Sequence, residues 1–342
     1  MSGKTWDSIH YEVDTVLIDG LWGTGKSLLH PIVSTFQGLE DARLEEVFEY
    51  IAQLDYLSKI DKNSADWLIK TYLDLIMHSN LLGRHSNLRW SDDTGLKHSF
   101  KKIEKIKRLF RSEKNNLSYQ AKKRKLGNVL MTHMVCCCPD VFFRSLNSRF
   151  FLIEIVRHPI HQLSHVVSYF SRFQESREKT LSFNIGEKKI PWFELNEYEK
   201  KNFYIKNNFD RAIDYLFNNY METWDNILKF KKKGNNIIEV SFEELVLDTN
   251  LVVNRIENFL GREATKNTFK AIKKNRLPRK LIHQGFGYKK YGWKESSLNN
   301  QKFYTSCLDE IKKNASEEYL FKLLDLVKIY NKRYSSLLNN YQ

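Results

Sequence analysis

The segment Gly20–Leu29, GLWGTGKSLL, follows directly on a short apolar run, Thr15–Asp19. Its first eight residues fit the pattern G-x-x-x-x-G-K-[ST], in which glycines let backbone N–H groups approach phosphate oxygens closely. A helix is expected to begin near Lys26 and Ser27, and the positive end of its dipole favours an anion at the loop. The sequence therefore predicts a phosphate-binding loop between a strand and a helix, with a plain glycine-rich turn as the alternative.

Three more apolar runs match the first in character: Asn128–Thr132, Phe150–Val156 and Asn236–Val240. Such runs, separated by stretches with helical spacing, predict parallel strands that are buried on both faces. Helices are expected around residues 44–54, 64–76, 252–259 and 320–338, with Ser64 capping the second and Gly261 ending the third. We therefore expect an α/β protein with a three-layer, P-loop-like fold, in which helices flank a central parallel sheet.

The length of 342 residues and the hydrophobic content of 42% are sufficient for one large core. We expect a single domain over residues 1–342, with a helical and basic insert at about 40–127 and a C-terminal helix at about 316–340. The polar segment Ser171–Asn202 is expected to be an irregular insertion.

Charge is the most unusual feature of the composition. Lysine and arginine number 55 against 41 aspartates and glutamates, which gives a formal net charge of +14. This balance favours anionic partners, although a solvated lysine-rich surface is an equal alternative. Two basic stretches, Lys101–Arg111 and Ala121–Lys125, suit either an acidic acceptor or a solvated helix face. No nucleic-acid-binding motif is present, so nucleic acid is not the expected partner.

Location follows from what the chain lacks. No segment approaches the roughly 20 apolar residues that cross a bilayer, and the first residues, MSGKTWDSIHYEV, have no apolar signal-peptide core. Three of the four cysteines are consecutive, Cys136–Cys138, which does not suit a tetrahedral metal site. We expect a cytoplasmic protein with reduced thiols, no membrane segment and no bound metal.

Polar residues follow each predicted strand. The loop comes after the first strand, His133 after the second, Arg157 after the third and Ser241 to Glu244 after the fourth. Because ligands in open parallel sheets bind beyond the carboxyl ends of the strands, these groups are expected to converge on one edge.

The loop alone does not choose between phosphate donors. A kinase that uses ATP also needs Mg²⁺, usually held by an acidic residue that ends a second strand. Here the third strand ends at Arg157, Glu154 lies inside it, and Glu243 follows the fourth strand. A basic group at a strand end indicates a second anionic group on the ligand, and a Mg²⁺-dependent P-loop kinase stays the alternative.

The order of these motifs resembles the sulfotransferases that use 3′-phosphoadenosine 5′-phosphosulfate (PAPS). The segment VLMTHMVCCCPDVFFRSLNSRFFLIEIVRHPIHQLSHVVSYF is similar to their second and third strands and the helix that follows. VSFEELVLDTNLVVNRIENFLG looks like their later strand–helix unit, and GYKKYGWKES is similar to their basic C-terminal loop. The resemblance covers roughly residues 14–295 and implies sulfuryl transfer from PAPS to an acceptor hydroxyl, expected on a carbohydrate or glycan.

The resemblance also implies roles for residues. His133 would be the catalytic base and Lys26 a catalytic donor. The cofactor-binding residues it implies are Gly23, Thr24, Gly25, Lys26 and Ser27 for the 5′-phosphosulfate, Arg157, Ser164, Lys289 and Lys290 for the 3′-phosphate, and Phe242 near the adenine.

This chain departs from the family pattern at several positions. The family loop usually carries Lys or Arg where this chain has Gly23, and threonines where it has Lys26 and Ser27. The family serine usually stands where this chain has His165, so Ser164 is chosen over Ser168. Met131 replaces a lysine that often precedes the T-H pair.

Chemistry is compatible with the resemblance. Sulfuryl transfer needs no metal in principle, and a histidine suits removal of the acceptor's proton. His133 as an ordinary strand-end histidine is the alternative to this role. The pair His161 and His165 in HQLSH is similar to a zinc helix, but Gln162 replaces its glutamate. A third class, a basic protein that binds nucleotides or nucleic acid without catalysis, is less favoured.

Overall fold

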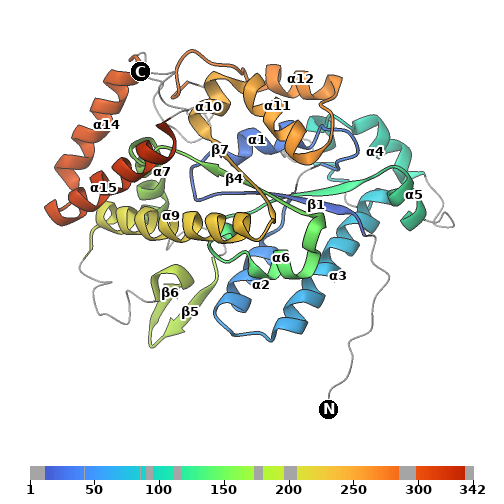
Figure 1. Ribbon diagram of the computed structural model, residues 1–342, viewed down its shortest axis with the longest axis horizontal. Coiled ribbons are helices and arrows are strands. Elements are labelled where there is room, and N and C mark those ends of the chain that lie inside the picture. Colours follow the sequence, from blue (N-terminus) through green and yellow to red (C-terminus); the bar gives the residue numbers. More distant parts are fainter. Residues whose placement is uncertain are drawn as a thin grey trace.

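A parallel sheet of five strands runs through the centre of the protein (Figure 1). The computed structural model describes residues 12–41, 43–84, 86–89, 95–110, 117–172, 180–195, 206–284 and 298–335. In spatial order the strands are β2 (Arg43–Leu44), β3 (Gly127–Met131), β1 (Asp14–Asp19), β4 (Phe150–Val156) and β7 (Asn236–Ser241). All four neighbouring pairs are parallel.

The strands are buried on both faces, as their unbroken apolar sequences require. Successive side chains of β1 point to opposite faces, so Val16 and Ile18 enter one core while Leu17 enters the other. The same alternation in β4 sends Ile153 and Ile155 to the first core and Leu152 to the second. Two hydrophobic cores therefore lie back to back across the sheet.

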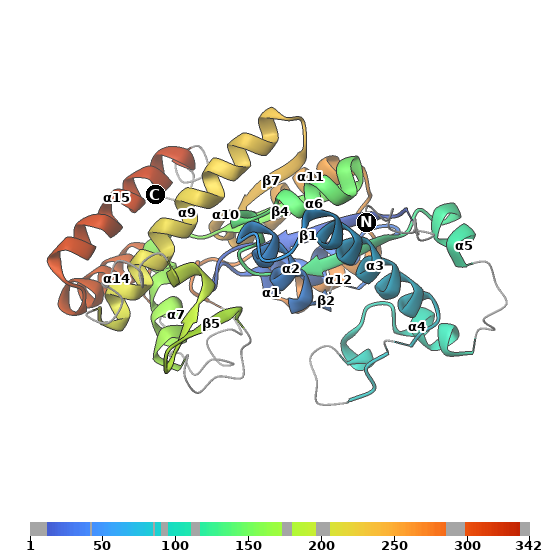
Figure 2. The ribbon, with the colours of Figure 1, turned by 90° about the horizontal axis from the view of Figure 1, so that it is seen from below.

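Helices cover both faces and complete three layers (Figures 1 and 2). One core is closed by α1 (Lys26–Val33), α10 (Phe242–Leu247), α11 (Thr249–Leu260) and α12 (Lys266–Lys274). The other is closed by α2 (Glu46–Tyr56), α3 (Lys62–Leu81), α6 (Asp140–Leu146), α7 (Pro159–Arg172), α9 (Asn208–Lys232), α14 (Asn300–Asn314) and α15 (Glu317–Arg333). The predicted three-layer α/β fold is confirmed.

Local sequence signals account for most element ends. The four predicted strands are present, each within one residue of its expected bounds. Gly261 ends α11 in the left-handed conformation with φ 60°, which glycine adopts without strain. The prediction that Ser64 caps α3 was wrong, because the side chain of Asp61 accepts the hydrogen bond from the Ser64 N–H and the helix begins at Lys62. Leu338 lies outside the described residues.

The expectation of an irregular insertion over Ser171–Asn202 was wrong for its described part. A two-stranded antiparallel hairpin, β5 (Ser182–Ile185) with β6 (Lys188–Pro191), lies there. Gly186 turns the chain with φ 62°, and Ile190 is fully buried. The polar composition of the segment concealed this short alternating pattern.

Two shorter helices complete the region before β3. They are α4 (Lys102–Leu109) and α5 (Leu117–Lys123), which overlap the two basic stretches found in the sequence. Figure 2 shows them at the end of the molecule opposite α14 and α15. Among the described residues, every helix is too short or too polar to cross a membrane.

Candidate active site

The glycine-rich loop joins β1 to α1, as predicted, and its glycines are required by close packing. Gly23 has φ 82° and Gly25 has φ 98°, both in the region that glycine adopts without strain. A Cβ at Gly25 would lie 2.4 Å from the ring of Phe242, and one at Gly23 would lie 2.9 Å from the ring of His165. Gly25 is the N-cap of α1, and no side chain of the described residues caps this helix. The loop therefore presents backbone to the carboxyl edge of the sheet.

Lys26 is the first residue of α1 and its side chain folds back over the loop. Its Nζ donates to the carbonyl oxygens of Gly20 at 2.5 Å and Leu21 at 2.7 Å, and the residue is only 5% exposed. Burial lowers the pKa of Lys26 to about 8, against the opposing effect of nearby carboxyl groups. In the described part of the chain, no carboxylate oxygen lies within ion-pair distance of this ammonium group. Lys26 is thus a desolvated cation at the loop.

Two buried carboxyl groups act electrostatically on Lys26. Asp19 and Glu154 are register partners on β1 and β4. Asp19 accepts hydrogen bonds from the Thr132 hydroxyl at 2.9 Å and from the Cys136 N–H at 2.6 Å. Burial raises the pKa of both carboxyl groups, and Lys26 opposes that rise in each. The Oε2 atom of Glu154 is buried and has no hydrogen-bond partner. The ammonium of Lys26 thus interacts electrostatically with both carboxyl groups.

His133 follows β3 and is held by a carboxylate that sequence reasoning missed. The Oε1 atom of Glu49, on α2, lies 2.8 Å from the His133 backbone nitrogen and 3.0 Å from Nδ1. In the tautomer that carries its ring proton on Nδ1, His133 donates to this oxygen and Nε2 is an acceptor. Burial raises the pKa of Glu49 to about 8. The only signal for Glu49 in the sequence is a carboxyl group beside the apolar positions of its helix.

Arg157 follows β4 and contacts residues that follow β1 and β7. Its backbone N–H donates to the Tyr220 hydroxyl at 3.0 Å, and its Nη1 donates to the Gly23 carbonyl oxygen at 3.0 Å. The guanidinium carbon lies 4.3 Å from the centre of the Phe242 ring, which follows β7. The Nε atom is buried without a hydrogen-bond partner. Arg157 therefore keeps donor capacity at the point where the loop and the end of β7 meet.

The alternative for Arg157 was an ion pair with Glu154 or Glu243. Within the described residues Arg157 forms no such pair. The carboxylate of Glu243 instead accepts from the His158 N–H at 3.0 Å and from the Tyr330 hydroxyl at 3.1 Å. His161, and after it His158, lower the pKa of Glu243 to about 2 against the effect of burial.

The helix α7 brings His165, rather than Ser164, against the loop. The His165 ring packs on Gly23, and burial together with the charges of Arg157 and Lys26 lowers its pKa to about 3. Ser164 is exposed and Ser168 is half-buried. The described residues contain no group of three or more His, Cys, Asp or Glu side chains placed to hold a metal ion.

The other residues predicted to bind the cofactor are Thr24, Ser27, Lys289 and Lys290. Thr24 is buried and its hydroxyl donates to the Leu21 carbonyl oxygen at 2.9 Å. Ser27 is exposed in the first turn of α1. Lys289 and Lys290 lie outside the described residues.

An aromatic cluster fixes the other side of the loop. Trp22 stacks on Tyr169 with ring centres 4.9 Å apart and on Tyr215 at 4.7 Å. The Gln162 amide donates to the Trp22 carbonyl oxygen at 2.7 Å. These contacts order the loop before any ligand arrives, and sequence reasoning gave no role to Trp22.

A scan against protein-family models finds no match for this chain. A search of curated proteins also finds no match. Among solved structures, the chain is similar to the sulfotransferase domain of the Synechococcus PCC 7002 olefin synthase, with 14% identity, 96% of this chain and 98% of that chain covered, and a TM-score of 0.45. It is also similar to the sulfotransferase domain from the curacin biosynthetic pathway, with 11% identity, 87% and 98% covered, and a TM-score of 0.41. A sulfotransferase from Mycobacterium avium matches with 11% identity, 96% and 77% covered, and a TM-score of 0.41. All three are structures of sulfotransferases, the family that the sequence motifs resemble.

Proposed function

We propose that this protein is a sulfotransferase that moves a sulfuryl group from PAPS to an acceptor hydroxyl. One observation carries the proposal. Arg157 stands at a strand end beside the loop with a buried Nε that has no partner, and it pairs with no carboxylate of the described residues. A second anionic group on the ligand, at a distance from the group held by the loop, accounts for such an arginine.

The residues at this edge fit a ligand with two anionic ends. Positive-φ glycines and Lys26 form one cationic position, and Arg157 forms the other. PAPS supplies an activated sulfuryl group on its 5′-phosphate. The 5′-phosphosulfate would be held by Gly23, Thr24, Gly25, Lys26 and Ser27, the 3′-phosphate by Arg157, Ser164, Lys289 and Lys290, and the adenine by Phe242.

His133 and Lys26 would carry the chemistry. As the acceptor oxygen bonds to sulfur and the bond from sulfur to the phosphate oxygen breaks, the hydroxyl proton passes to Nε2 of His133. Glu49, bonded to Nδ1, fixes the orientation of the ring. The Lys26 ammonium stabilises the charge that develops on the departing phosphate oxygen, and its burial strengthens this effect.

We further propose a carbohydrate or glycan hydroxyl as the acceptor and the cytoplasm as the location. The cysteines support the second point. Cys136, Cys137 and Cys138 are buried free thiols, and Cys307 is also free. No disulfide joins any of the four, as is usual where thiols stay reduced, and burial raises the pKa of each of the three consecutive thiols well above its usual value.

A Mg²⁺-dependent kinase is the second candidate. It is favoured by the sequence of the loop and by the buried carboxyl groups of Asp19 and Glu154 beside Lys26. Magnesium dependence separates the two activities, because sulfuryl transfer from PAPS needs no metal in principle.

The decisive experiment titrates the protein with PAP, the desulfated product of PAPS, and with AMP. Wild type is expected to prefer PAP strongly, and Arg157→Ala should lose most of that preference while its affinity for AMP barely changes. Arg149→Ala is the matched control, because Arg149 precedes β4 at the opposite edge whereas Arg157 follows it. Equal affinity of wild type for PAP and AMP would remove the main support for a sulfotransferase, and transfer from ATP only with Mg²⁺ would establish the kinase.

A further inference from the structure

An open groove lies between α4 and α12 and has a volume of about 760 Å³. Five cationic side chains line it: Lys101, Lys102, Lys107, Arg124 and Lys270. Glu104 is the only carboxylate among its lining residues. Part of the net charge of +14 of the chain is therefore concentrated in this groove.

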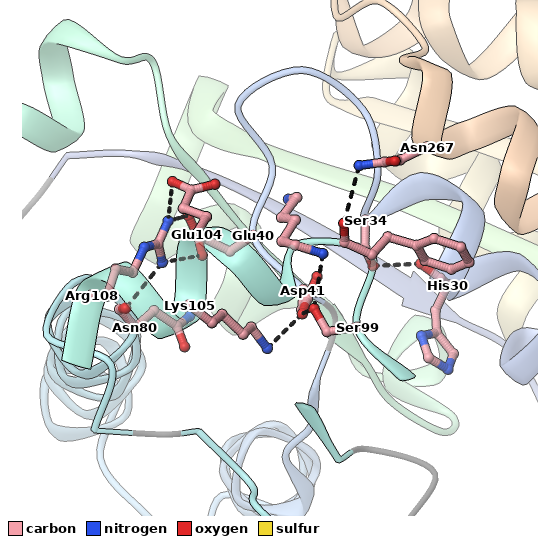
Figure 3. A network of polar contacts seen from close by, with 12 residues as sticks. His30, Ser34, Glu40, Asp41, Asn80, Ser99, Glu104, Lys105, Arg108 and Asn267 are labelled. Carbon is pink, nitrogen blue, oxygen red and sulfur yellow. Dashed lines mark hydrogen bonds and ion pairs between the residues drawn. The ribbon is translucent and has the colours of Figure 1, made fainter. Parts of the chain in front are cut away.

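The carboxylates of the groove wall are already neutralised (Figure 3). Arg108 donates to both oxygens of Glu40, at 2.7 and 2.8 Å, and to Glu104 at 2.8 Å. Glu104 also pairs with Arg124, and these cations hold its pKa at about 2 against the effect of burial. Glu40 and Glu104 thus already have arginine partners.

A second pair strengthens the same wall. Asp41 accepts from the Ser99 hydroxyl at 2.7 Å and lies 2.5 Å from the Nζ of Lys105 (Figure 3). Lys105 lowers the pKa of Asp41 against the effect of burial. The expectation that the first basic stretch is a wholly solvated helix face was therefore incomplete, since Arg108 and Lys105 hold α4 to the protein.

The outward lysines of the groove keep their charge available. Lys102, Lys107 and Lys270 are exposed, and in the described part of the chain none of them forms an ion pair. An ammonium group is a compact point charge that suits tetrahedral oxyanions such as phosphate and sulfate. Several such charges along one groove suit a ligand that carries several anions in a row.

The groove lies at the opposite edge of the sheet from the candidate active site. Thr35, two residues beyond the end of α1, contacts Thr268 of α12 with hydroxyl oxygens 2.9 Å apart, whereas α1 begins at the loop. Asn267 of α12 donates to the Phe100 carbonyl oxygen before α4, at 3.1 Å. The six residues of β1 separate the two edges by roughly 20 Å. The groove is therefore a separate feature from the loop.

The lining also restricts the kind of polyanion. Phe100 is the only aromatic residue in it, and Lys274 lies over that ring, 5.4 Å from its centre. Proteins that bind single-stranded nucleic acid stack bases on exposed aromatic faces, whereas the one aromatic ring in this lining is half-buried and has Lys274 over it.

We propose that the groove binds a linear polyanion that carries sulfate or phosphate groups and no bases. The site is held in shape by the Arg108 and Asp41 pairs and makes its contacts through Lys102, Lys107 and Lys270. It acts independently of the loop, so the proposal stands whether or not the protein transfers sulfuryl groups.

The test uses the full chain and two labelled probes, a dextran sulfate fragment and inorganic polyphosphate. The variant Lys102→Gln/Lys107→Gln/Lys270→Gln removes three groove charges at exposed positions. The control Lys232→Gln/Lys312→Gln/Lys332→Gln removes the same net charge from exposed lysines of α9, α14 and α15, none of which lines the groove. Affinity is measured by fluorescence anisotropy over a range of salt concentrations, with circular dichroism to confirm folding.

The groove variant is expected to lose about tenfold or more in affinity for at least one probe, while the control stays within about twofold. The dependence of log K on log salt should become shallower by about two units, since each lost contact removes about 0.7. The probe with the higher affinity identifies sulfate or phosphate as the preferred group. Equal losses in both variants, or no binding by wild type at physiological salt, would overturn the proposal. Tighter binding of a single-stranded DNA oligomer than of either probe would contradict the proposal that the ligand carries no bases.

Discussion

Lys26 and Arg108 are two buried cations of one chain that meet opposite surroundings. Arg108 is 2% exposed and donates hydrogen bonds to the carboxylates of Glu40 and Glu104, which raise its pKa. Lys26 is 5% exposed and bonds only to backbone carbonyl oxygens, and its pKa is lowered to about 8. The first cation completes a structural network, whereas the second carries a charge that the surrounding hydrogen bonds leave uncompensated.

The difference indicates where a ligand is needed. A buried cation with its own carboxylates gains nothing from an anion, because its charge is already balanced. A buried cation without them gains the full interaction with an arriving phosphate, and the low dielectric surroundings strengthen it. By this criterion we expect Lys26 and Arg157 to bind a ligand and Arg108 to be structural.

The largest expected effect concerns Arg108 and the stability of the folded protein. Arg108→Met should lower the free energy of unfolding by about 3–5 kcal/mol, because it leaves Glu40 buried without its partner. Lys26→Met should change stability far less, since it removes a desolvated charge that no carboxylate pairs. Urea denaturation of the two variants measures both values. Similar losses in the two variants would contradict the distinction between the two cations.

The next effect concerns turnover at the binding edge. His133→Ala should lower turnover by roughly 10²-fold or more, as removal of a general base does. The affinity for PAP should change little, since His133 is expected to face the acceptor. Steady-state kinetics with PAPS and calorimetry with PAP measure the two quantities. A variant with wild-type turnover would show that His133 is an ordinary strand-end histidine.

A smaller effect is expected at Lys26, on the free energy of PAP binding. Lys26→Ala should weaken PAP binding by about 1.5–3 kcal/mol, the usual value of a hydrogen bond to a charged group. Lys62→Ala is the matched control, because Lys62 is also the first residue of its helix but is exposed. Equal binding by all three proteins in a PAP titration would mean that Lys26 only stabilises the loop.

The smallest effect concerns pH. Burial raises the pKa of Glu49 to about 8, so the folded state keeps a proton that the unfolded chain loses above its ordinary pKa of 4.5. Stability from this group is therefore full below pH 4.5 and falls as the pH rises toward 8. Glu49→Gln cannot ionise, and its unfolding free energy should fall less between pH 5 and 8, by at least about 1 kcal/mol. Parallel melting-temperature profiles for the two proteins would contradict the raised pKa.

Much of the fold could be predicted because the strands are buried on both faces. An unbroken apolar run of seven residues such as Phe150–Val156 is typical of a parallel strand covered by helices on both sides. The hairpin β5–β6 was missed because its few apolar residues lie among charged ones and their burial depends on distant helices. The cap of α3 was misplaced by three residues because Asp61 and Ser64 have similar capping propensity.

The site was predictable only where its residues follow strands. Gly23, His133 and Arg157 meet at one edge because parallel strands end together. Glu49 comes from a helix, 84 residues away from its partner His133, and no spacing rule connects the two. Arg108 looked like one more lysine or arginine in a basic stretch, and only the folded chain shows that it is buried.

The contact between Gly23 and His165 couples two positions that lie far apart in the sequence. The sulfotransferases that the motifs resemble usually place a long basic side chain at the first position and a small serine at the second. Here any side chain at position 23 would meet the imidazole ring at 2.9 Å, and the φ of 82° would strain it further. The imidazole of His165 therefore occupies the space that a side chain at position 23 would need. A larger residue at position 23 is expected to be tolerated only together with a smaller one at position 165.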